Sequence, residues 1–125
     1  MADLGQTIDF IKQYLDARVA NHSLRASNVA NAETPNYRAL VPSFQVRLDQ
    51  QMRAPEPGLF SAVGPALKVD MKVAPSSAPG REDGNNVQLE KEMSELAQNS
   101  LQYATAYKIL SKQMAIARYA ISSGR

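Results

Sequence analysis

Proline and glycine are placed so unevenly along this chain that their positions constrain the fold more than any other feature. All seven prolines and four of the six glycines lie between residues 35 and 84, whereas residues 1–34 and 87–122 contain no proline and one glycine. Proline removes a backbone donor and disfavours a helical residue before it, so long helices are confined to the two flanking arms. The chain therefore divides into an N-terminal helical arm at 1–35, a variable middle insert at 36–86 and a C-terminal helical arm at 87–125, the two arms forming one core domain.

The N-terminal arm has the apolar spacing of a single amphipathic helix. Its apolar residues recur at steps of three and four, and the polar residues between them form a solvated face. The helix should end just before Thr34 and Pro35, because the residue before a proline is pushed out of the helical conformation. We predict a helix over residues 4–32. Its apolar seam consists of Leu4, Ile8, Ile11, Leu15 and Val19.

The C-terminal arm has a longer and more regular apolar row. Steps of four and three continue without a slip for more than four heptads, which is typical of a coiled-coil seam. A second row containing Leu101 widens the apolar face, so this helix is predicted to meet more than one partner helix. The turn D-G-N-N at residues 83–86 is expected to cap a helix over residues 88–122. Its seam consists of Leu89, Met93, Leu96, Tyr103, Tyr107, Leu110, Met114 and Ile121.

The middle insert has short β patterns. Leu67–Val73 alternates apolar and charged residues, and Leu40–Leu48 is a weaker strand with Pro42 marking an edge. Two isolated strands are marginal in water, so the insert should be ordered only where it packs on the helices or on a neighbour. The predicted fold class is all-α, an antiparallel, coiled-coil-like pair of long N- and C-terminal helices with a small irregular or β-hairpin insert. Loops are predicted at Ala54–Gly64 and Ala74–Gly84.

Several classes of chemistry are excluded by composition. The chain has no cysteine, so thiol catalysis, disulfides and thiolate metal sites are ruled out, and its one histidine, His22, cannot form a His-pair metal site. His22 is better explained as a seam or interface residue than as a catalytic or metal-binding imidazole. Phosphate-binding and nucleophile-elbow glycine motifs are absent. We therefore expect no enzyme activity, no cofactor, no metal and no small-molecule substrate.

Charge argues against nucleic acid as a partner. The formal net charge is +2, and the 14 basic and 12 acidic residues are spread along the chain rather than gathered in a basic stripe. Tyr103 and Tyr107 could stack on bases, but rings four residues apart on an apolar row more often belong to a core. Three glutamates in the first turns of the C-terminal arm could be imagined as acid–base catalysts, but a favourable interaction with the helix dipole explains them better. They are Glu90, Glu92 and Glu95.

The strongest signal is the run from Ala26 to Ala39, A-S-N-V-A-N-A-E-T-P-N-Y-R-A. Asn28 and Asn31 lie three residues apart on one flank of the predicted helix, among small residues. Asparagine is a poor residue inside a helix because its amide competes for backbone hydrogen bonds, and small residues let another backbone approach closely. The run indicates either a helix end packed against another segment, with the amides bonded to it, or ordinary fraying into a turn.

This run resembles the N-terminal signature of the bacterial flagellar rod and hook proteins, S-N-[IV]-A-N-x-x-T-P-G-Y. The run D-G-N-N-V with the following L-E-K-E-M, and the stretch from Tyr103 to Ile121, are similar to the start and the body of that family's C-terminal helix. The short length and the form T-P-x-Y-R-A look most like the proximal rod members. Asn36 stands where the family commonly has glycine, and asparagine is the next residue best able to adopt a left-handed conformation. The assembly motif carried over by this resemblance is Ser27, Asn28, Val29, Asn31, Thr34, Pro35 and Tyr37.

The resemblance implies a structural subunit of the flagellar basal body that forms part of the proximal rod in the periplasm. It implies export through the flagellar type III apparatus without a cleaved signal peptide, and polymerisation through paired terminal helices. The implied partners are other rod proteins, further copies of the chain, and membrane-ring and export-gate proteins at the rod base. The free chain is expected to keep its arms poorly ordered until it assembles. The alternatives are a sibling rod protein, or a helical-hairpin adaptor or chaperone.

Overall fold

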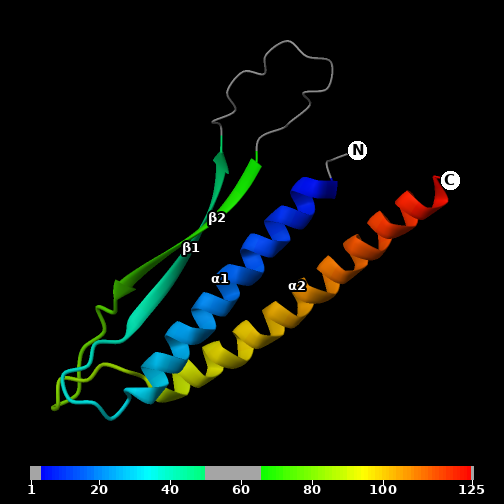
Figure 1. Cartoon of the computed structure of the whole chain (residues 1–125). Helices are drawn as coiled ribbons and strands as arrows, with labels where there is room; N and C mark the ends of the chain where they lie inside the picture. Colours follow the sequence, from blue (N-terminus) through cyan, green and yellow to red (C-terminus); the bar gives the residue numbers. More distant parts are fainter. Residues whose placement is uncertain (1–3, 50–65, 125) are drawn as a thin grey trace.

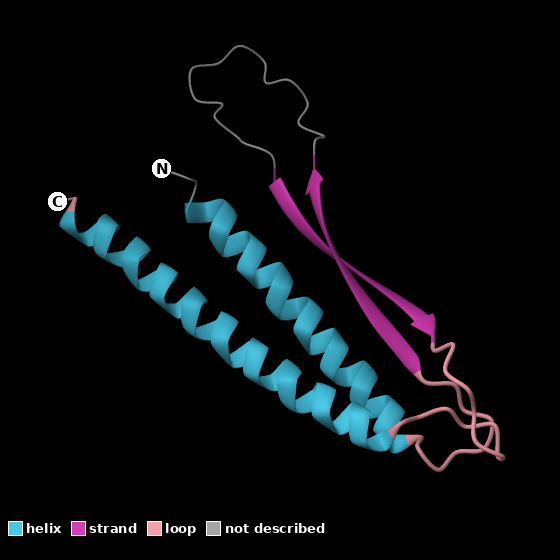
Figure 2. Cartoon of the chain, turned by 180° about the vertical axis from the view of Figure 1, so that it is seen from behind, coloured by secondary structure: helices cyan, strands magenta, loops and turns pink. Residues whose placement is uncertain are grey.

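The structure, a computed structural model, describes residues 4–49 and 66–124. Its elements in chain order are α1 (Leu4–Ala30), β1 (Leu40–Asp49), β2 (Ala66–Pro75) and α2 (Leu89–Ser123). Helix α1 lies between the β hairpin and α2, the connecting loops gather at one end, and α1 begins and α2 ends at the other (Figures 1 and 2). The loop predicted at Ala54–Gly64 lies outside the described residues.

The two helices run antiparallel and are in contact, as predicted. Arg25 of α1 lies against Glu92 of α2 near the loops, and Ile11 packs with Ala106 further along the pair. The ends closest to the loops are nearest to one another, and the helices diverge toward the free ends (Figures 1 and 2). Neither described helix is both long and apolar enough to cross a membrane.

The apolar core between the helices is small. Ile11, Leu15 and Ala106 are buried together, with Tyr14 and Leu110 packed beside them. A buried aliphatic side chain contributes about 1.5–3 kcal/mol, so a cluster of this size leaves much of the helix contact to other interactions. Those interactions are polar and lie toward the loops.

The buried face of α1 departs from the predicted seam after Leu15. Leu4 and Ile8 are half-buried, but Val19 is 53% exposed and is not part of the buried face. That part of the prediction is wrong. The buried face continues at the same helical spacing through polar residues, which a search for apolar periodicity passes over. These residues are Arg18, Asn21, Arg25 and Asn28.

Only the margin of the predicted apolar row of α2 reaches the contact with α1, where Leu110 packs beside Ile11 and Leu15, so the helices do not pack seam to seam. The buried residues of α2 are Glu92, Asn99 and Ala106, seven residues apart on one face. Within the predicted row, Leu96 and Leu110 are half-buried at the margin of that face. The rest of the row lies beside it and is exposed, namely Leu89, Met93, Tyr103, Tyr107, Met114 and Ile121.

The middle insert forms an antiparallel hairpin of two ten-residue strands, so the fold is not strictly all-α. Its register pairs Leu40 with Pro75 and Asp49 with Ala66. Side chains alternate between the faces of a strand, and the apolar face containing Phe44 packs toward α1. The backbone N–H of Val69 also donates to Oε1 of Gln13 on α1 at 3.1 Å. Packing on α1 supports the short sheet, as two strands alone would not suffice.

Candidate assembly site

The side chain of Asn28 takes the place of a backbone partner for the start of β1. Asn28 is fully buried, its Nδ2 donates to the carbonyl of Leu40 at 2.8 Å, and its Oδ1 accepts from the N–H of Leu40 at 3.0 Å. The same oxygen accepts from the hydroxyl of Tyr37 at 3.2 Å. All of these contacts lie within one chain, so Asn28 fastens the strand to the end of α1. Its amide is satisfied by a packed neighbouring segment, and the alternative of a frayed helix end does not apply to it.

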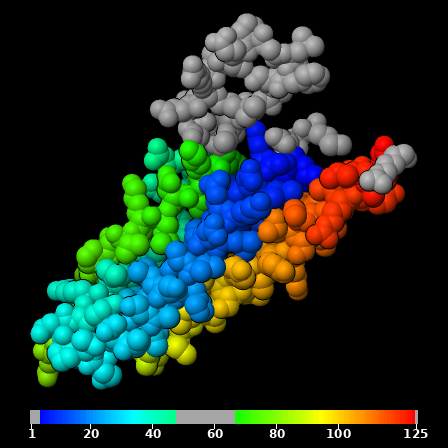
Figure 3. All heavy atoms as spheres, in the orientation of Figure 1, coloured from blue at the N-terminus to red at the C-terminus, as the bar shows by residue number. Residues whose placement is uncertain are grey.

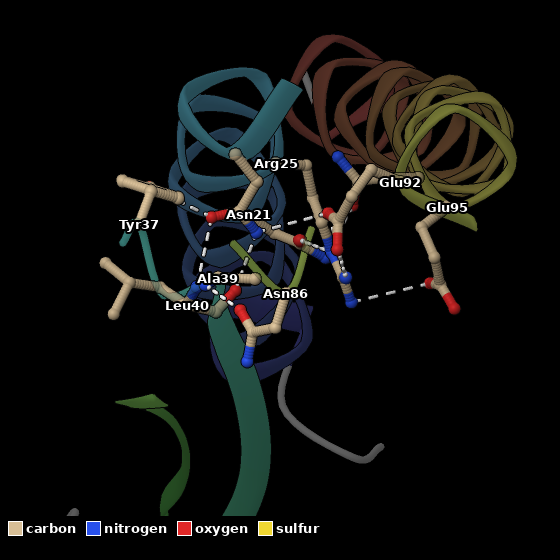
Figure 4. Close-up of polar contacts among 10 residues, drawn as sticks. Asn21, Arg25, Tyr37, Ala39, Leu40, Asn86, Glu92 and Glu95 are labelled. Atoms are coloured by element: carbon tan, nitrogen blue, oxygen red, sulfur yellow. Dashed lines mark hydrogen bonds and ion pairs between the residues drawn. The ribbon is translucent and has the colours of Figure 1, made fainter. Parts of the chain in front are cut away.

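A buried ion pair joins α1 to α2 beside Asn28. The Arg25 guanidinium donates through one nitrogen to both carboxylate oxygens of Glu92, each at 3.1 Å, and lies 3.7 Å from the carboxylate of Glu95. Glu92 also accepts from Nδ2 of Asn28 at 3.2 Å. Arg25 and Glu92 are 7% and 4% exposed. Such a pair offsets its own desolvation only when further hydrogen bonds support it, and here Asn28 donates to Glu92 while Nε of Arg25 donates to Oδ1 of Asn21 at 3.4 Å (Figure 4).

A second set of polar contacts continues toward the middle of the helices. Nδ2 of Asn21 donates to Oδ1 of Asn99 at 3.3 Å, and Nδ2 of Asn99 donates to the carbonyl of Arg18 at 2.9 Å. The Arg18 guanidinium lies over the rings of Tyr14 and Phe44, with its carbon 4.7 and 4.8 Å from their centroids. Arg18 therefore ties the hairpin and both helices together, since cations are attracted to aromatic faces at this range.

The D-G-N-N run does not cap α2. The residue before α2 is Gln88, which makes no side-chain capping bond. Instead, Nδ2 of Asn85 donates to the carbonyls of Asn31 and Thr34 at 2.9 and 2.8 Å. Oδ1 of Asn86 accepts from the N–H of Ala39 at 2.6 Å. The two sequence runs that carry the family resemblance thus interlock through asparagine amides, which bond backbone groups at the loop end of the molecule.

Two residues with left-handed backbone make this interlocking possible. Asn36 has φ of 59° and Gly84 has φ of 80°. A Cβ placed on Gly84 would lie 2.4 Å from Oδ1 of Asn36, so the two turns touch where only glycine fits. The backbone N–H of Asn36 donates to the carbonyl of Asp83 at 2.8 Å. The asparagine that replaces the usual family glycine thus adopts the left-handed conformation expected of it.

We call these polar contacts between the helices, β1 and the loop before α2 the polar joint. Only part of the predicted assembly motif belongs to it. Asn28 is inside it, and Tyr37 packs with Ala32 and Val87 beneath it. Asn31 bonds locally, its Nδ2 donating to the carbonyl of Ser27 at 2.8 Å. Val29 is half-buried, and the remaining motif residues, Ser27, Thr34 and Pro35, are exposed. The polar joint consists of Arg25, Asn28, Asn85, Asn86 and Glu92.

The other candidate residues lie in positions that differ from those predicted from the sequence. His22 is exposed beside a groove of about 280 Å³ between the helices, rather than in the seam. Tyr103 and Tyr107 are exposed rather than part of the core. The three glutamates at the start of α2 are not equivalent, because Glu92 and Glu95 pair with Arg25 whereas Glu90 is exposed. Among the residues that the structure describes, no group of acidic residues and histidine could hold a metal ion.

Sequence reasoning missed three of the five residues of the polar joint. Arg25 is one of the polar residues between the apolar steps of the N-terminal arm, which were predicted to form a solvated face, and Asn85 and Asn86 were predicted to cap α2. Neither pattern reveals a partner far away in the chain. The only available signal was the number of asparagines at or near helix positions, where this residue is intrinsically unfavourable. Asn21, Asn28 and Asn99 all lie within helices, and each bonds a residue of another element.

Comparison with known proteins gives one consistent result. No protein-family model matches the chain. It is 32% identical over 116 residues to the flagellar basal body rod protein FlgB of Bacillus subtilis, a match covering 82% of this chain and 83% of that protein. It is 33% identical over 107 residues to FlgB of Cereibacter sphaeroides, with the same coverage. FlgB of Salmonella typhimurium is 27% identical over 123 residues, covering 89% of each chain. Matches of this extent include residues of both helices.

Proposed function

The chain belongs to the FlgB family of flagellar basal body rod proteins, and we propose that it is a structural subunit of the proximal rod. The observation that carries this proposal is the extent of the family match, which covers 82–89% of the chain and so takes in both helices. The family name describes a part of a structure rather than a catalyst. A structural role is consistent with a molecule whose buried polar residues bond one another rather than line a catalytic cleft.

We further propose that the subunit assembles through its terminal helices. Helix α2 carries large apolar side chains that no described residue covers, including Leu101 at 69%, Tyr119 at 74% and Ile121 at 76% exposed. Scattered exposed apolar residues are normal, but a helix that is apolar on several faces is typical of one that is buried in an assembly. Other copies and other rod proteins would cover these faces, and helix ordering would accompany docking.

In this proposal the polar joint acts before assembly. It holds α1, β1 and the start of α2 in one arrangement, so that the exposed motif residues Ser27, Thr34 and Pro35 are presented at the loop end. Asn28 contributes by shaping this end of the subunit, because it is fully buried and has no surface to offer a neighbour. The subunit would link the membrane ring and export gate to the rest of the rod, after export without a cleaved signal peptide.

Deletion of the coding sequence in the host bacterium, followed by complementation, tests the proposal. Deleting the coding sequence should abolish rod assembly while the membrane ring still forms, and the intact chain supplied in trans should restore the rod and motility. Isolated basal bodies, viewed by electron microscopy and probed with an antibody to the chain, provide the readout. Normal rods in the deletion strain would refute a rod function. A chain that instead binds one flagellar protein stably in the cytosol would favour the adaptor or chaperone alternative.

A further inference from the structure

The loop before α2 contains a peptide bond that is chemically vulnerable. Asp83 is followed by Gly84, and the chain has no other aspartate or asparagine followed by glycine. Glycine has no side chain to shield its backbone nitrogen, and its backbone turns freely in an open chain. That nitrogen can then attack the carboxyl group of the preceding aspartate. The pair is therefore prone to rearrangement wherever the backbone around it is free to turn.

The rearrangement is a closing and reopening of a five-membered ring. The backbone nitrogen of Gly84 bonds to Cγ of Asp83 in its carboxylic acid form, and the acid OH leaves with the amide proton as one water molecule. Water from the solvent then opens the resulting cyclic imide. Breaking the new bond restores aspartate, whereas breaking the original peptide bond leaves isoaspartate, with the main chain running through Cγ. One water is lost and one is gained, so nothing is oxidised and the mass is unchanged.

The folded loop holds both reacting groups in other contacts. The N–H of Gly84 donates to the carbonyl of Arg81 at 2.9 Å. On the carboxylate of Asp83, Oδ1 accepts from the N–H of Asn85 at 3.1 Å, and Oδ2 lies 3.6 Å from Nη2 of Arg81. Ring closure needs the nitrogen without its proton and the carboxyl group turned toward it. Both sets of contacts must be given up before the nitrogen can attack.

The backbone on either side of the bond is fixed as well. The carbonyl of Asp83 accepts from the N–H of Asn36 at 2.8 Å. Asn85 is fully buried, and its Nδ2 donates to the carbonyls of Asn31 and Thr34. Water is not what limits the reaction, because Asp83 is exposed and the loops form one tip of the molecule in the space-filling view (Figure 3). What the fold withholds is the freedom of this backbone to turn.

We propose that Asp83 is a site of spontaneous isomerisation to isoaspartate, and that the contacts of Asn85 and Asn36 suppress the reaction while the loop end is closed. Isomerisation proceeds only through opening of this loop, so its rate reports the fraction of time that the loop is open. This inference goes beyond the proposed rod function and does not depend on it.

The product cannot rebuild the closed loop. In isoaspartate the former backbone carbonyl of Asp83, which accepts from Asn36, becomes the free carboxylate. The main chain also gains one bond, about 1.5 Å, immediately before Gly84. There is no space for this extension, because even a Cβ on Gly84 would lie 2.4 Å from Oδ1 of Asn36. A chain that stays open therefore loses the ability to close its loop end, whereas a closed chain is protected.

Incubation of the purified full chain at neutral pH tests the first part of the proposal. One sample is kept native and one is unfolded in guanidinium chloride, both in water enriched in oxygen-18. Trypsin then releases the peptide 82–91, in which isoaspartate is separated from aspartate by chromatography and ring opening is recorded by the incorporated isotope. We expect isomerisation to be at least about tenfold slower in the native sample. Equal rates in the two samples would overturn protection by the fold.

Two variants separate opening of the loop from a general loss of stability. Asn85→Ala removes the bonds to the carbonyls of Asn31 and Thr34 and should bring the native rate within about threefold of the unfolded rate. Asn99→Ala, the matched control, removes side-chain bonds between the helices and should leave the native rate slow. Equal acceleration by both variants would overturn the role of the loop contacts. So would a folded Asn85→Ala chain with an unchanged rate, folding being checked by circular dichroism.

Refolding tests the second part. Chain aged in denaturant is refolded and treated briefly with thermolysin, which digests open chains faster than closed ones. The isoaspartate form of the peptide 82–91 should be depleted from the chain that survives and enriched in the digested fraction. The same isoaspartate content in both fractions would show that the altered loop still closes, and would overturn this part of the proposal.

Discussion

Removing Arg25 should destabilise the chain far more than removing an arginine from its surface. In Arg25→Met the Glu92 carboxylate stays 4% exposed and loses both of its 3.1 Å bonds to the guanidinium. It keeps only the 3.2 Å bond from Asn28. Breaking a buried ion pair by removing one partner costs about 3–5 kcal/mol. Because Asn28 still donates to Glu92, we expect a loss near the lower limit, about 3 kcal/mol.

Two companion variants make this expectation specific. Arg47 pairs with Asp70 at 3.3 Å on the hairpin, but their side chains are 71% and 43% exposed, so Arg47→Met should cost less than about 1 kcal/mol. Combining Arg25→Met with Glu92→Leu removes both buried charges at once. Apolar replacements of a whole buried pair are often neutral or stabilising, so this double variant should be within about 1 kcal/mol of the original chain.

Urea unfolding followed by far-ultraviolet circular dichroism measures these differences. With a slope of about 1–2 kcal/mol per molar urea, a loss of 3 kcal/mol lowers the midpoint by roughly 1.5–3 M. The unfolding slope must stay unchanged for the comparison to hold. The reasoning is refuted if Arg25→Met lowers the midpoint no more than Arg47→Met does, or if the double variant loses the sum of the two single losses.

Three further outcomes follow from the loop end and the free helix ends. Gly84→Ala should cost at least about 1–2 kcal/mol, because its φ is positive and the new methyl group meets the Asn36 side chain, whereas Gly124→Ala should be near neutral in the same urea unfolding experiment. Asn31→Leu should reduce rod assembly in cells more than it reduces the solubility of the purified chain, and unchanged motility would contradict a role in assembly. In dilute solution, amide exchange should be fastest in the last turns of α2 and slowest at the polar joint, and uniform strong protection would argue against ordering on assembly.

Sequence reasoning succeeded where the information is local. Proline is confined to the middle of the chain, and apolar residues recur at steps of three and four on either side. The helix ends predicted from these two patterns lie within two residues of the observed ends. The alternation from Leu67 to Val73 located β2 in the same way. Each signal depends on neighbours within one or two turns, which is the range over which backbone conformation is decided.

The same reasoning failed on which helix face is buried. The apolar row of α2 is more continuous than the face that contacts α1, yet Glu92 and Asn99 are buried whereas Tyr107 is exposed. Apolar periodicity identifies a surface that avoids water, but it does not say whether the same chain or another one covers it. In this fold no described residue covers most of the more apolar row, whereas polar residues of α2 such as Glu92 and Asn99 face inward.

The sequence by itself thus determined the elements, their order and the two runs that identify the family. Only the tertiary structure decided that Asn28 pairs with Leu40, that Arg25 meets Glu92, and that the D-G-N-N run bonds the loop after α1 rather than capping α2. Arg25 and Glu92 are 67 positions apart in the chain. Burial of a polar side chain is favourable only when its hydrogen-bond partners are already in place. A buried group left without a partner costs more free energy than one hydrogen bond contributes. Whether such residues belong to the surface or the interior is therefore a property of the assembled fold and not of the local pattern.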